Sequence, residues 1–236
     1  MHLKQLFKSL KDRENGSTRE LPKTYPNTDD VHIELNNVEW MSHLNSLKLM
    51  KDFITIDTEN DMLDILSSQV SYTSLKGRDV AMFGGTVTAD GLCCDQTLIN
   101  TLWLSKLTNL IDSNIKNDLN GFKVNHVLIN KYHRGDGIMP HKDGPLYFPV
   151  VTILSLGSDC VMTFTKDDKS ELLKVLIPAR SLFQFSGELY ERFLHEIDFS
   201  TTDVIDYSVL FGGDARVSER TQRFSLTFRY VDPIVR

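Results

Sequence analysis

Four residues in the C-terminal half of the chain have the types and the spacing for chemistry at a metal. His141 and Asp143 form an HxD pair, His195 follows about fifty residues later, and Arg223 begins the segment RFSLTFR. Two imidazoles and one carboxylate can hold Fe(II) on one face and leave three coordination positions open. A guanidinium nearby could pair with an acidic co-substrate. The combination indicates oxygen chemistry at an iron centre.

The spacing of the HxD pair suits an extended backbone. Residues two apart on a strand point to the same side, so His141 and Asp143 can reach one point while Lys142 faces away. His195 lies far enough along the chain for four or five strands to intervene. An HxD pair alone is weak evidence, since a single histidine is more often structural. Its conjunction with the other motifs favours a facial metal site built from two strands.

The last strand expected in the chain has one polar, cationic face and one apolar face. Its polar positions alternate with its apolar ones: Arg223, Ser225, Thr227 and Arg229 against Phe224, Leu226 and Phe228. Two arginines turned inward would carry a large desolvation cost unless a bound dianion offset it. In the alternative, the arginines lie at the rim of a barrel or pair with acids such as Asp206.

A second strand could serve the same ligand. Asn130 and Tyr132 are two residues apart, so an amide and a phenol share one face of their strand and could hydrogen-bond the same molecule. Either residue alone would be unremarkable.

Two helices and a flap are expected before these strands. Residues 52–70 have apolar positions at helical spacing, with Asp57 or Thr58 as caps, and residues 97–114 have a second such pattern. Leu98, Leu102, Leu107, Leu110 and Ile111 would lie near one face of the second helix. Residues 77–91, between the helices, read as a hairpin or exposed flap.

After Gly121 the pattern changes to short apolar runs separated by turn residues, which is typical of a sandwich or closed jelly roll. We therefore expect an α+β fold, with a jelly-roll core at 121–236 buttressed by helices and a flap at 51–120. Residues 51–236 would form a single domain. Residues 1–50 would form a partly flexible N-terminal extension, of which the first 30 are polar and punctuated by proline.

Composition limits the class of protein. The chain has 236 residues, 41% hydrophobic and 25% charged, and no apolar run approaches the roughly 20 residues of a membrane span. The N-terminus lacks a secretory signal pattern, so we expect a cytoplasmic or nuclear protein, with no membrane partner. Cys93, Cys94 and Cys160 are expected to be reduced thiols.

Charge bears on the choice of partner. The net charge of -6 argues against nonspecific adhesion to nucleic acid but leaves a locally basic groove open. The first 23 residues carry six Lys or Arg against three Asp or Glu. This segment is either a solvated tail or a contact for nucleic acid or another partner.

Taken together, these motifs make the chain resemble the AlkB-like family of Fe(II)- and 2-oxoglutarate-dependent dioxygenases. The shared pattern is NxY, HxD, a distant His and RxSLTxR, here at residues 130–132, 141–143, 195 and 223–229. The stretch MPHKDGPLYFPVVTILSLG is most similar to the branch of AlkB homologue six. Many AlkB enzymes carry Asn where this chain has Ser225.

The resemblance implies a double-stranded β-helix and assigns roles to the motif residues. His141, Asp143 and His195 would bind Fe(II). Arg223 would pair with the distal carboxylate of 2-oxoglutarate, and its other expected contacts are Asn130, Tyr132, Ser225 and Arg229. With O2 as co-substrate, hydroxylation of an N-alkyl carbon would yield an aldehyde, succinate and a dealkylated base.

The resemblance also implies a flap that grips a flipped or single-stranded nucleotide. Gly84 and Gly85 would be its hinge or close-approach glycines, and Met82, Phe83 and Tyr147 would stack against a base or wedge beside it. Equally, these three side chains could be packing residues.

The function expected from these residues is oxidative dealkylation, as in demethylation, of N-alkylated bases in DNA or RNA by a monomer. Two alternatives stay open. The same iron chemistry could serve a protein or peptide hydroxylase or demethylase, which the net charge of -6 favours somewhat. A non-catalytic nucleic-acid-binding module is the other alternative.

Overall fold

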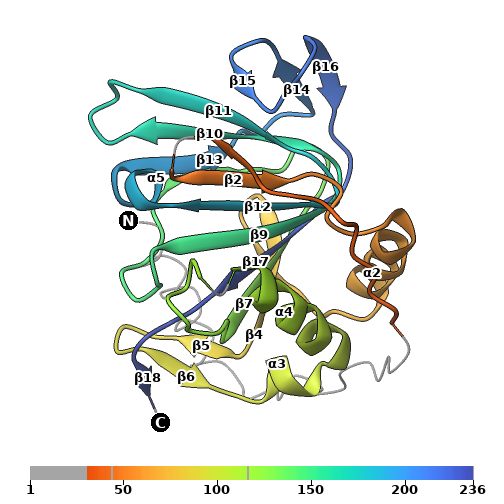
Figure 1. Ribbon diagram of the computed structural model, residues 1–236, viewed down its shortest axis with the longest axis vertical. Coiled ribbons are helices and arrows are strands. Elements are labelled where there is room, and N and C mark those ends of the chain that lie inside the picture. Colours follow the sequence, from red (N-terminus) through yellow and green to blue (C-terminus); the bar gives the residue numbers. More distant parts are fainter. Residues whose placement is uncertain (1–30, 44, 116, 236) are drawn as a thin grey trace.

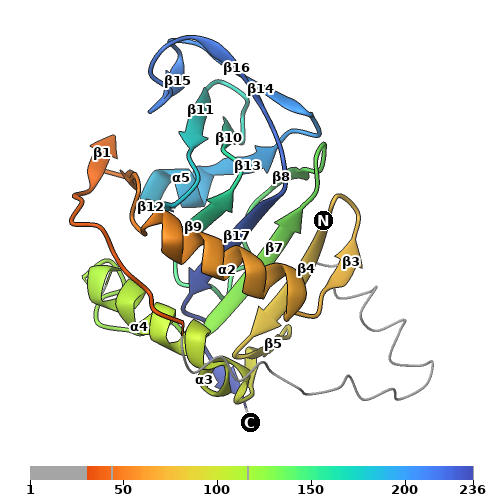
Figure 2. The ribbon, with the colours of Figure 1, turned by 90° about the vertical axis from the view of Figure 1, so that its right-hand side faces the viewer.

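The computed structural model describes residues 31–43, 45–115 and 117–235. Two β-sheets pack face to face, and helices α2 (Ile56–Ser68) and α4 (Leu102–Ile115) cover the outer face of the larger sheet (Figures 1 and 2). No described helix has the length and apolar character needed to span a bilayer.

The larger sheet contains eight strands, and each neighbouring pair in it is antiparallel. Strand β17 lies near its middle, between β9 and β7. In spatial order the strands are β1 (Met41–His43), β2 (Leu47–Met50), β12 (Ser181–Ser186), β9 (Val150–Gly157), β17 (Arg223–Arg229), β7 (His126–Tyr132), β4 (Arg78–Phe83) and β3 (Thr73–Leu75).

The smaller sheet contains five strands, and only its edge strand β15 pairs in parallel. In spatial order they are β15 (Val209–Leu210), β11 (Leu172–Ile177), β10 (Cys160–Lys166), β13 (Phe193–Ile197) and β8 (Ile138–His141). Strands that are consecutive in the sequence repeatedly change sheets. The arrangement is the expected α+β fold, a double-stranded β-helix buttressed by helices.

Short elements complete the described structure. Helix α5 (Gly187–Arg192) joins the two sheets. A two-stranded sheet contains β14 (Thr202–Ile205) and β16 (Arg216–Glu219), and a three-stranded sheet contains β18 (Ile234–Val235), β6 (Leu92–Cys94) and β5 (Gly85–Val87). Helix α3 (Thr97–Asn100) precedes α4.

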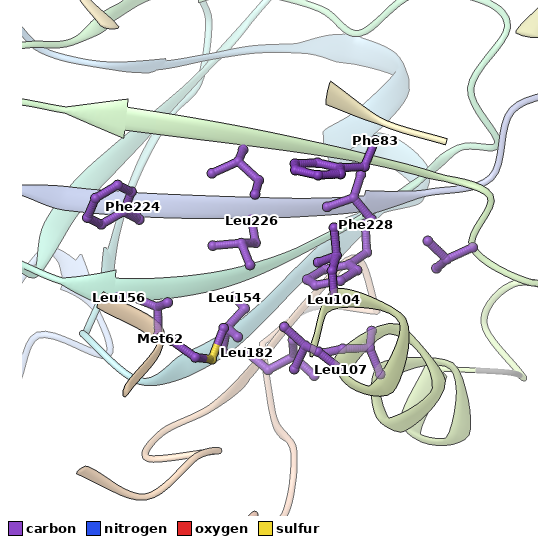
Figure 3. Packing of buried hydrophobic residues seen from close by; sticks show 14 of the residues in the cluster. Met62, Phe83, Leu104, Leu107, Leu154, Leu156, Leu182, Phe224, Leu226 and Phe228 are labelled. Carbon is purple, nitrogen blue, oxygen red and sulfur yellow. The ribbon is translucent and has the colours of Figure 1, made fainter. Parts of the chain in front are cut away.

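Strand β17 separates an apolar layer from a polar one, as its alternating sequence predicts. Phe224, Leu226 and Phe228 are almost completely buried and pack with Met62 of α2 and Leu104 of α4, among others (Figure 3). The intervening residues of β17 turn to the other face, toward the smaller sheet. A second apolar cluster lies between the sheets and includes Ile153, Phe164 and Phe183. The polar face of β17 is thus enclosed on all sides by packed strands.

The two predicted helices exist, but their details differ from the expectation. The N-cap of α2 is Thr55, whose hydroxyl accepts a hydrogen bond from Thr58 N at 3.3 Å, rather than Asp57 or Thr58. An extended backbone at Thr55 puts the side chain in place to cap, whereas the two predicted residues are already helical.

The second helix is broken at Thr101 into α3 and α4. This break rotates the apolar face of the segment. Leu102, which was expected on the buried face, is 39% exposed, and the core side of α4 is formed instead by Trp103, Leu104, Leu107, Ile111 and Ile115.

The segment expected as an exposed flap is only partly one. Its first half is β4, an interior strand paired with β7, and its second half is β5, which pairs with β6 outside the main sheets. The expectation of an exposed flap at residues 77–91 is therefore wrong for β4.

The division of the chain at residue 50 remains a prediction. Residues 1–30 of the expected extension lie outside the described part of the chain. Within that extension, however, β2 pairs with β12, and Leu47 and Leu49 are completely buried between the sheets. The packed part of the chain therefore begins before residue 51.

Candidate metal and co-substrate site

Three potential metal ligands meet between the two sheets. His141 ends β8 and is paired in register with His195 of β13, and Asp143 follows directly after β8. The nearest ligand atoms of the three side chains all lie within 4.8 Å of one another. The two imidazole centroids are 4.2 Å apart. The HxD spacing and the distant His therefore converge as the sequence predicts.

Lys142, between the first two of these residues, points away from them. Its amine donates hydrogen bonds to Asp167 Oδ2 and to the carbonyl oxygen of Glu191, each at 2.6 Å. This outward pairing agrees with the predicted alternation, in which the side chain of Lys142 lies on the side opposite to His141 and Asp143.

A backbone contact sets the orientation of the His141 ring. Nδ1 of His141 lies 2.9 Å from the carbonyl oxygen of Met139. Because a carbonyl can only accept, Nδ1 carries the proton and Nε2 keeps its lone pair. A neutral imidazole with its second nitrogen held in this way is the usual state of a metal-ligating histidine.

The protonation states of the cluster suit a cation. Burial lowers the pKa of His195 to about 3 and also lowers the pKa of His141, so both rings are neutral near pH 7. Burial alone would raise the pKa of Asp143, but the positive charge of Arg229 opposes this effect, and the net result is a lowered pKa. The cluster offers two neutral nitrogens and one carboxylate.

Asp143 is also paired with Arg229 of β17. Nη1 of Arg229 lies 3.0 Å from Asp143 Oδ2, and both side chains are buried. The ion pair leaves the carboxylate with further lone pairs that could bind a cation. The Arg229 guanidinium lies 4.4 Å from the ring centre of Tyr147, and its Nε has no hydrogen-bond partner among the described residues. The contact of Arg229 with a metal-ligand candidate was not predicted.

Arg223, at the other end of the same strand face, has the character of an anion site. It is 3% exposed, and its Nε donates to Ser155 Oγ at 3.0 Å. Nη1 and Nη2 are buried and have no partner in the described chain, and no acid there forms an ion pair with them. The ring centre of Tyr132 is 5.5 Å from the guanidinium. The alternative that the arginines lie at a rim or pair with acids such as Asp206 is wrong for Arg223, whereas Arg229 does pair with an acid, Asp143.

Sheet register places the other predicted co-substrate residues beside Arg223. Tyr132 is its direct partner on β7, and Ser225 lies between Asn130 on one side and Ser155 on the other. All of these face the interior between the sheets. A buried cation with two unpartnered N–H groups, flanked by hydroxyls and an amide, fits a dicarboxylate such as 2-oxoglutarate. The His141 cluster likewise fits Fe(II).

Two further polar residues on this face were missed from the sequence. Arg78, the first residue of β4, donates from Nε to Asn130 Oδ1 at 2.9 Å. His126 is 1% exposed, and neither ring nitrogen has a hydrogen-bond partner among the described residues. The position of His126, an even number of residues before Asn130 on the same strand, is the one signal that could have placed it on the polar face.

The residues predicted to contact a substrate separate into two groups. Phe83 is 6% exposed and packs in the apolar cluster beneath the helices, so a stacking role for it is wrong (Figure 3). It alternates with Met82, which is half-buried on the opposite, polar face of β4. Tyr147 is half-buried against Arg229. For Met82 and Tyr147 a contact with substrate stays a prediction.

Gly84 and Gly85 occupy points of close backbone approach. A Cβ on Gly84 would lie 2.1 Å from the carbonyl oxygen of Asn125, and one on Gly85 would lie 2.2 Å from that of Cys93. Both residues also have positive φ values, +97° and +132°. Glycine is therefore required where the chain leaves β4 for β5.

Comparison with known proteins identifies similar chains. A sequence model of the 2OG-Fe(II) oxygenase superfamily matches residues 94–229. The "Probable RNA/DNA demethylase ALKBH6" of Danio rerio is 30% identical over 204 residues, covering 78% of this chain and 85% of that protein. The "tRNA (carboxymethyluridine(34)-5-O)-methyltransferase alkbh8" of Xenopus tropicalis is 31% identical over 198 residues, covering 78% of this chain and 31% of that protein.

A solved structure supports the fold. The match to "The structure of OsALKBH1" has a TM-score of 0.55 at 12% sequence identity, and it covers 81% of this chain and 99% of that chain. Similarity at this level of identity shows a shared fold alone.

Proposed function

Because the chain belongs to the AlkB-like 2OG-Fe(II) oxygenases and is thus a dioxygenase using Fe(II), 2-oxoglutarate and O2, we propose that it oxidatively dealkylates N-alkylated bases in DNA or RNA. The observation that carries the proposal is one enclosed strand face. It carries both Arg229, which pairs with Asp143 of the metal cluster, and Arg223, whose two buried N–H groups have no partner in the described chain.

Each side chain at this site has a proposed role. His141, Asp143 and His195 hold Fe(II), and Arg229 fixes the Asp143 carboxylate by their ion pair. Arg223 receives one carboxylate of 2-oxoglutarate through Nη1 and Nη2, while Ser155 holds its Nε. Tyr132, Asn130 and Ser225 surround the rest of the co-substrate.

When bound, Fe(II) and 2-oxoglutarate would allow O2 to hydroxylate a substrate C–H bond, with one oxygen atom entering the substrate and the other the succinate that is released with carbon dioxide. The residues of this chain bind, orient and exclude water. Phe164 and Phe185 flank His195 with ring centroids 6.1 Å and 5.0 Å away, which keeps that side of the site dry. Tyr190 donates to the carbonyl oxygens of Gly144 and Tyr147 and so anchors the loop after Asp143.

Nucleic acid is the proposed substrate because the Danio rerio relative, of which this chain covers 85%, is named for RNA/DNA demethylation. Hydroxylation of an N-methyl carbon gives an N-hydroxymethyl group, whose C–N bond breaks to release formaldehyde while the nitrogen takes the hydroxyl proton, so base dealkylation needs no further catalytic group. A protein substrate is the second candidate, and the net charge of -6 is the observation that favours it.

Succinate formation from 2-oxoglutarate by iron-loaded protein tests the proposal. Methylated DNA and RNA oligonucleotides, their unmethylated counterparts and methylated histone peptides would be compared as stimulants. The proposal expects stimulation by a methylated oligonucleotide, weakening steeply with added salt. Stimulation by peptides alone would assign the activity to proteins, and no succinate from iron-loaded protein would indicate a binding module.

A further inference from the structure

Arg78 is a cation of the site that none of the sequence motifs contains. It is the first residue of β4 and lies two positions before Val80, which pairs with Asn130 of β7. Residues two apart on a strand share a face, so Arg78 lies on the same polar face as Asn130 and the β17 arginines. Its side chain is half-buried.

The contact between Arg78 and Asn130 fixes the orientation of an amide. Arg78 Nε lies 2.9 Å from Asn130 Oδ1. A guanidinium can only donate hydrogen bonds, so the amide atom that faces it must be the oxygen. The Nδ2 group of Asn130 is therefore turned to the other side, away from β4.

That Nδ2 group has no partner within the described residues, although Asn130 is 6% exposed. The Nδ2 atom keeps some exposure, so water or a ligand can accept a hydrogen bond from it. Asn130 is in register with Ser225, which lies two residues from Arg223 on β17. The unused donor is thus beside the arginine that has two unused donors of its own.

The charges of this face leave room for a dianion. Arg229 is paired with Asp143, whereas neither Arg78 nor Arg223 forms an ion pair with any described residue. Both charges reach Tyr132: burial raises the pKa of its phenol, and Arg78 and Arg223 act against that rise. Arg223, which has unused donors, is therefore the cation placed to pair with a carboxylate, while Arg78 is engaged with Asn130.

We propose that Arg78 is a positioning residue for 2-oxoglutarate, which acts by holding the Asn130 amide with its N–H groups directed at the co-substrate. The inference rests on the proposed co-substrate role of Asn130. Without Arg78 the amide is free to rotate, and the oxygen can then face the carboxylate and repel it.

Two substitutions of Arg78 differ in whether they keep a hydrogen-bond donor at the position of Nε. In Arg78→Gln, the side-chain nitrogen occupies the same place along the chain as Arg Nε, so a neutral donor to Asn130 remains. In Arg78→Met, a methyl group takes that place and the donor is lost. Calorimetry would measure the dissociation constant of 2-oxoglutarate for Mn(II)-loaded protein, together with the affinity for Mn(II).

The loss of one oriented hydrogen bond is expected to raise the 2-oxoglutarate dissociation constant about tenfold in Arg78→Met. Arg78→Gln should stay within about threefold of the unsubstituted protein, since the donor is kept. Mn(II) affinity should be unchanged in both. In turnover assays the KM for 2-oxoglutarate should rise in Arg78→Met while kcat at saturation holds. If Arg78→Gln weakens 2-oxoglutarate binding as much as Arg78→Met does, the charge of Arg78 rather than the orientation of Asn130 is responsible for the effect, and the proposal is overturned.

A double-mutant cycle with Asn130→Ala separates this inference from the proposed role of Asn130. Arg78→Met should add almost nothing in the Asn130→Ala background, since the amide it orients is gone. Additive effects would overturn the inference while leaving the role of Asn130 intact. If Asn130→Ala binds 2-oxoglutarate normally, the proposed role of Asn130 fails. If only the KM for an oligonucleotide responds to Arg78→Met, Arg78 contacts the nucleic acid instead.

Discussion

Arg229 Nη1 and Asp143 Oδ2 lie 3.0 Å apart, with 8% and 5% of their side chains exposed. The pair joins the central strand of the larger sheet to the loop that follows β8 in the smaller one. Each charge would be costly alone in this interior, because neither is solvated. The ion pair therefore links the stability of the fold to the geometry of a metal-ligand candidate.

Breaking this pair should destabilise the protein strongly. Arg229→Gln leaves the Asp143 carboxylate buried without a cation, and removal of one partner of a buried pair costs about 3–5 kcal/mol. Denaturant unfolding of the metal-free protein measures the change. The matched control is Arg134→Gln, whose pair with Glu219 is largely exposed and should matter little. Equal effects of the two substitutions would contradict this account of the pair.

The metal cluster predicts which histidines matter for binding. His141→Ala or His195→Ala should each weaken Mn(II) or Co(II) binding by more than the roughly 10–100-fold typical of outer-shell changes. His133→Ala serves as control, because His133 lies outside the cluster and its side chain is 55% exposed. Titration of the metal-free protein gives the affinities. Retention of full affinity in either cluster variant would refute the assignment of that ligand.

Substitution of Arg223 should leave the stability of the protein intact but weaken its binding of 2-oxoglutarate. Arg223→Met removes two buried N–H groups that have no partner, so the metal-free protein should keep its Tm or gain slightly. Binding of 2-oxoglutarate should weaken by more than about 100-fold, since two charge-assisted hydrogen bonds are lost. Thermal unfolding with and without 2-oxoglutarate tests both expectations together. A lower Tm with unchanged binding would mean that Arg223 is a structural residue.

The buried ring of His126 is expected to make the folded protein less stable in acid. Burial lowers its pKa from 6.5 to about 4, with Arg229 adding to the effect. Between these two values the unfolded chain binds a proton that the folded chain excludes. Stability is therefore lost as the pH falls through this window, by up to about 3 kcal/mol from this residue.

The His126 contribution can be isolated by substitution. Because the other buried histidines also exclude protons, the comparison is between the slopes of unfolding free energy against pH in the unsubstituted protein and in His126→Leu. The slope between pH 6.5 and 4.5 should flatten in His126→Leu, and the exposed His43 provides the control substitution. An unchanged slope would show that His126 is already protonated in the folded protein.

The sequence predicts the parts of this protein that follow strict alternation. On β17 the period of two separates Phe224 from Arg223 without ambiguity, and the structure places them on opposite faces. The HxD motif is predictive for the same reason, because alternation along the backbone puts the side chains of His141 and Asp143 on one side, where they meet in the metal cluster. In such segments the local pattern of polar and apolar residues is enough to predict which side chains face the core and which face the site.

Other features depend on contacts that the local pattern does not contain. The register of β4 against β7 decides that Phe83 faces the core and that Arg78 meets Asn130 across 52 positions of sequence. The pairing of β2 with β12 likewise brings residues before position 51 into the sheet. The break in the helix at Thr101 cannot be read from the apolar periodicity of the segment. The choice of Thr55 as the cap cannot be read either, because two other suitable polar residues follow it closely in the sequence.

The most direct test of the central claim is the mass of a methylated oligonucleotide after incubation with iron-loaded protein, 2-oxoglutarate and O2. The account predicts a loss of one CH2 unit for each removed methyl group, matched by equal amounts of succinate and formaldehyde. Arg223→Met and His141→Ala should abolish that loss. The contrary result would be unchanged masses for a whole panel of N-methylated DNA and RNA oligonucleotides, obtained with protein that does release succinate when a peptide is added. That result would contradict the claim that the substrate is nucleic acid.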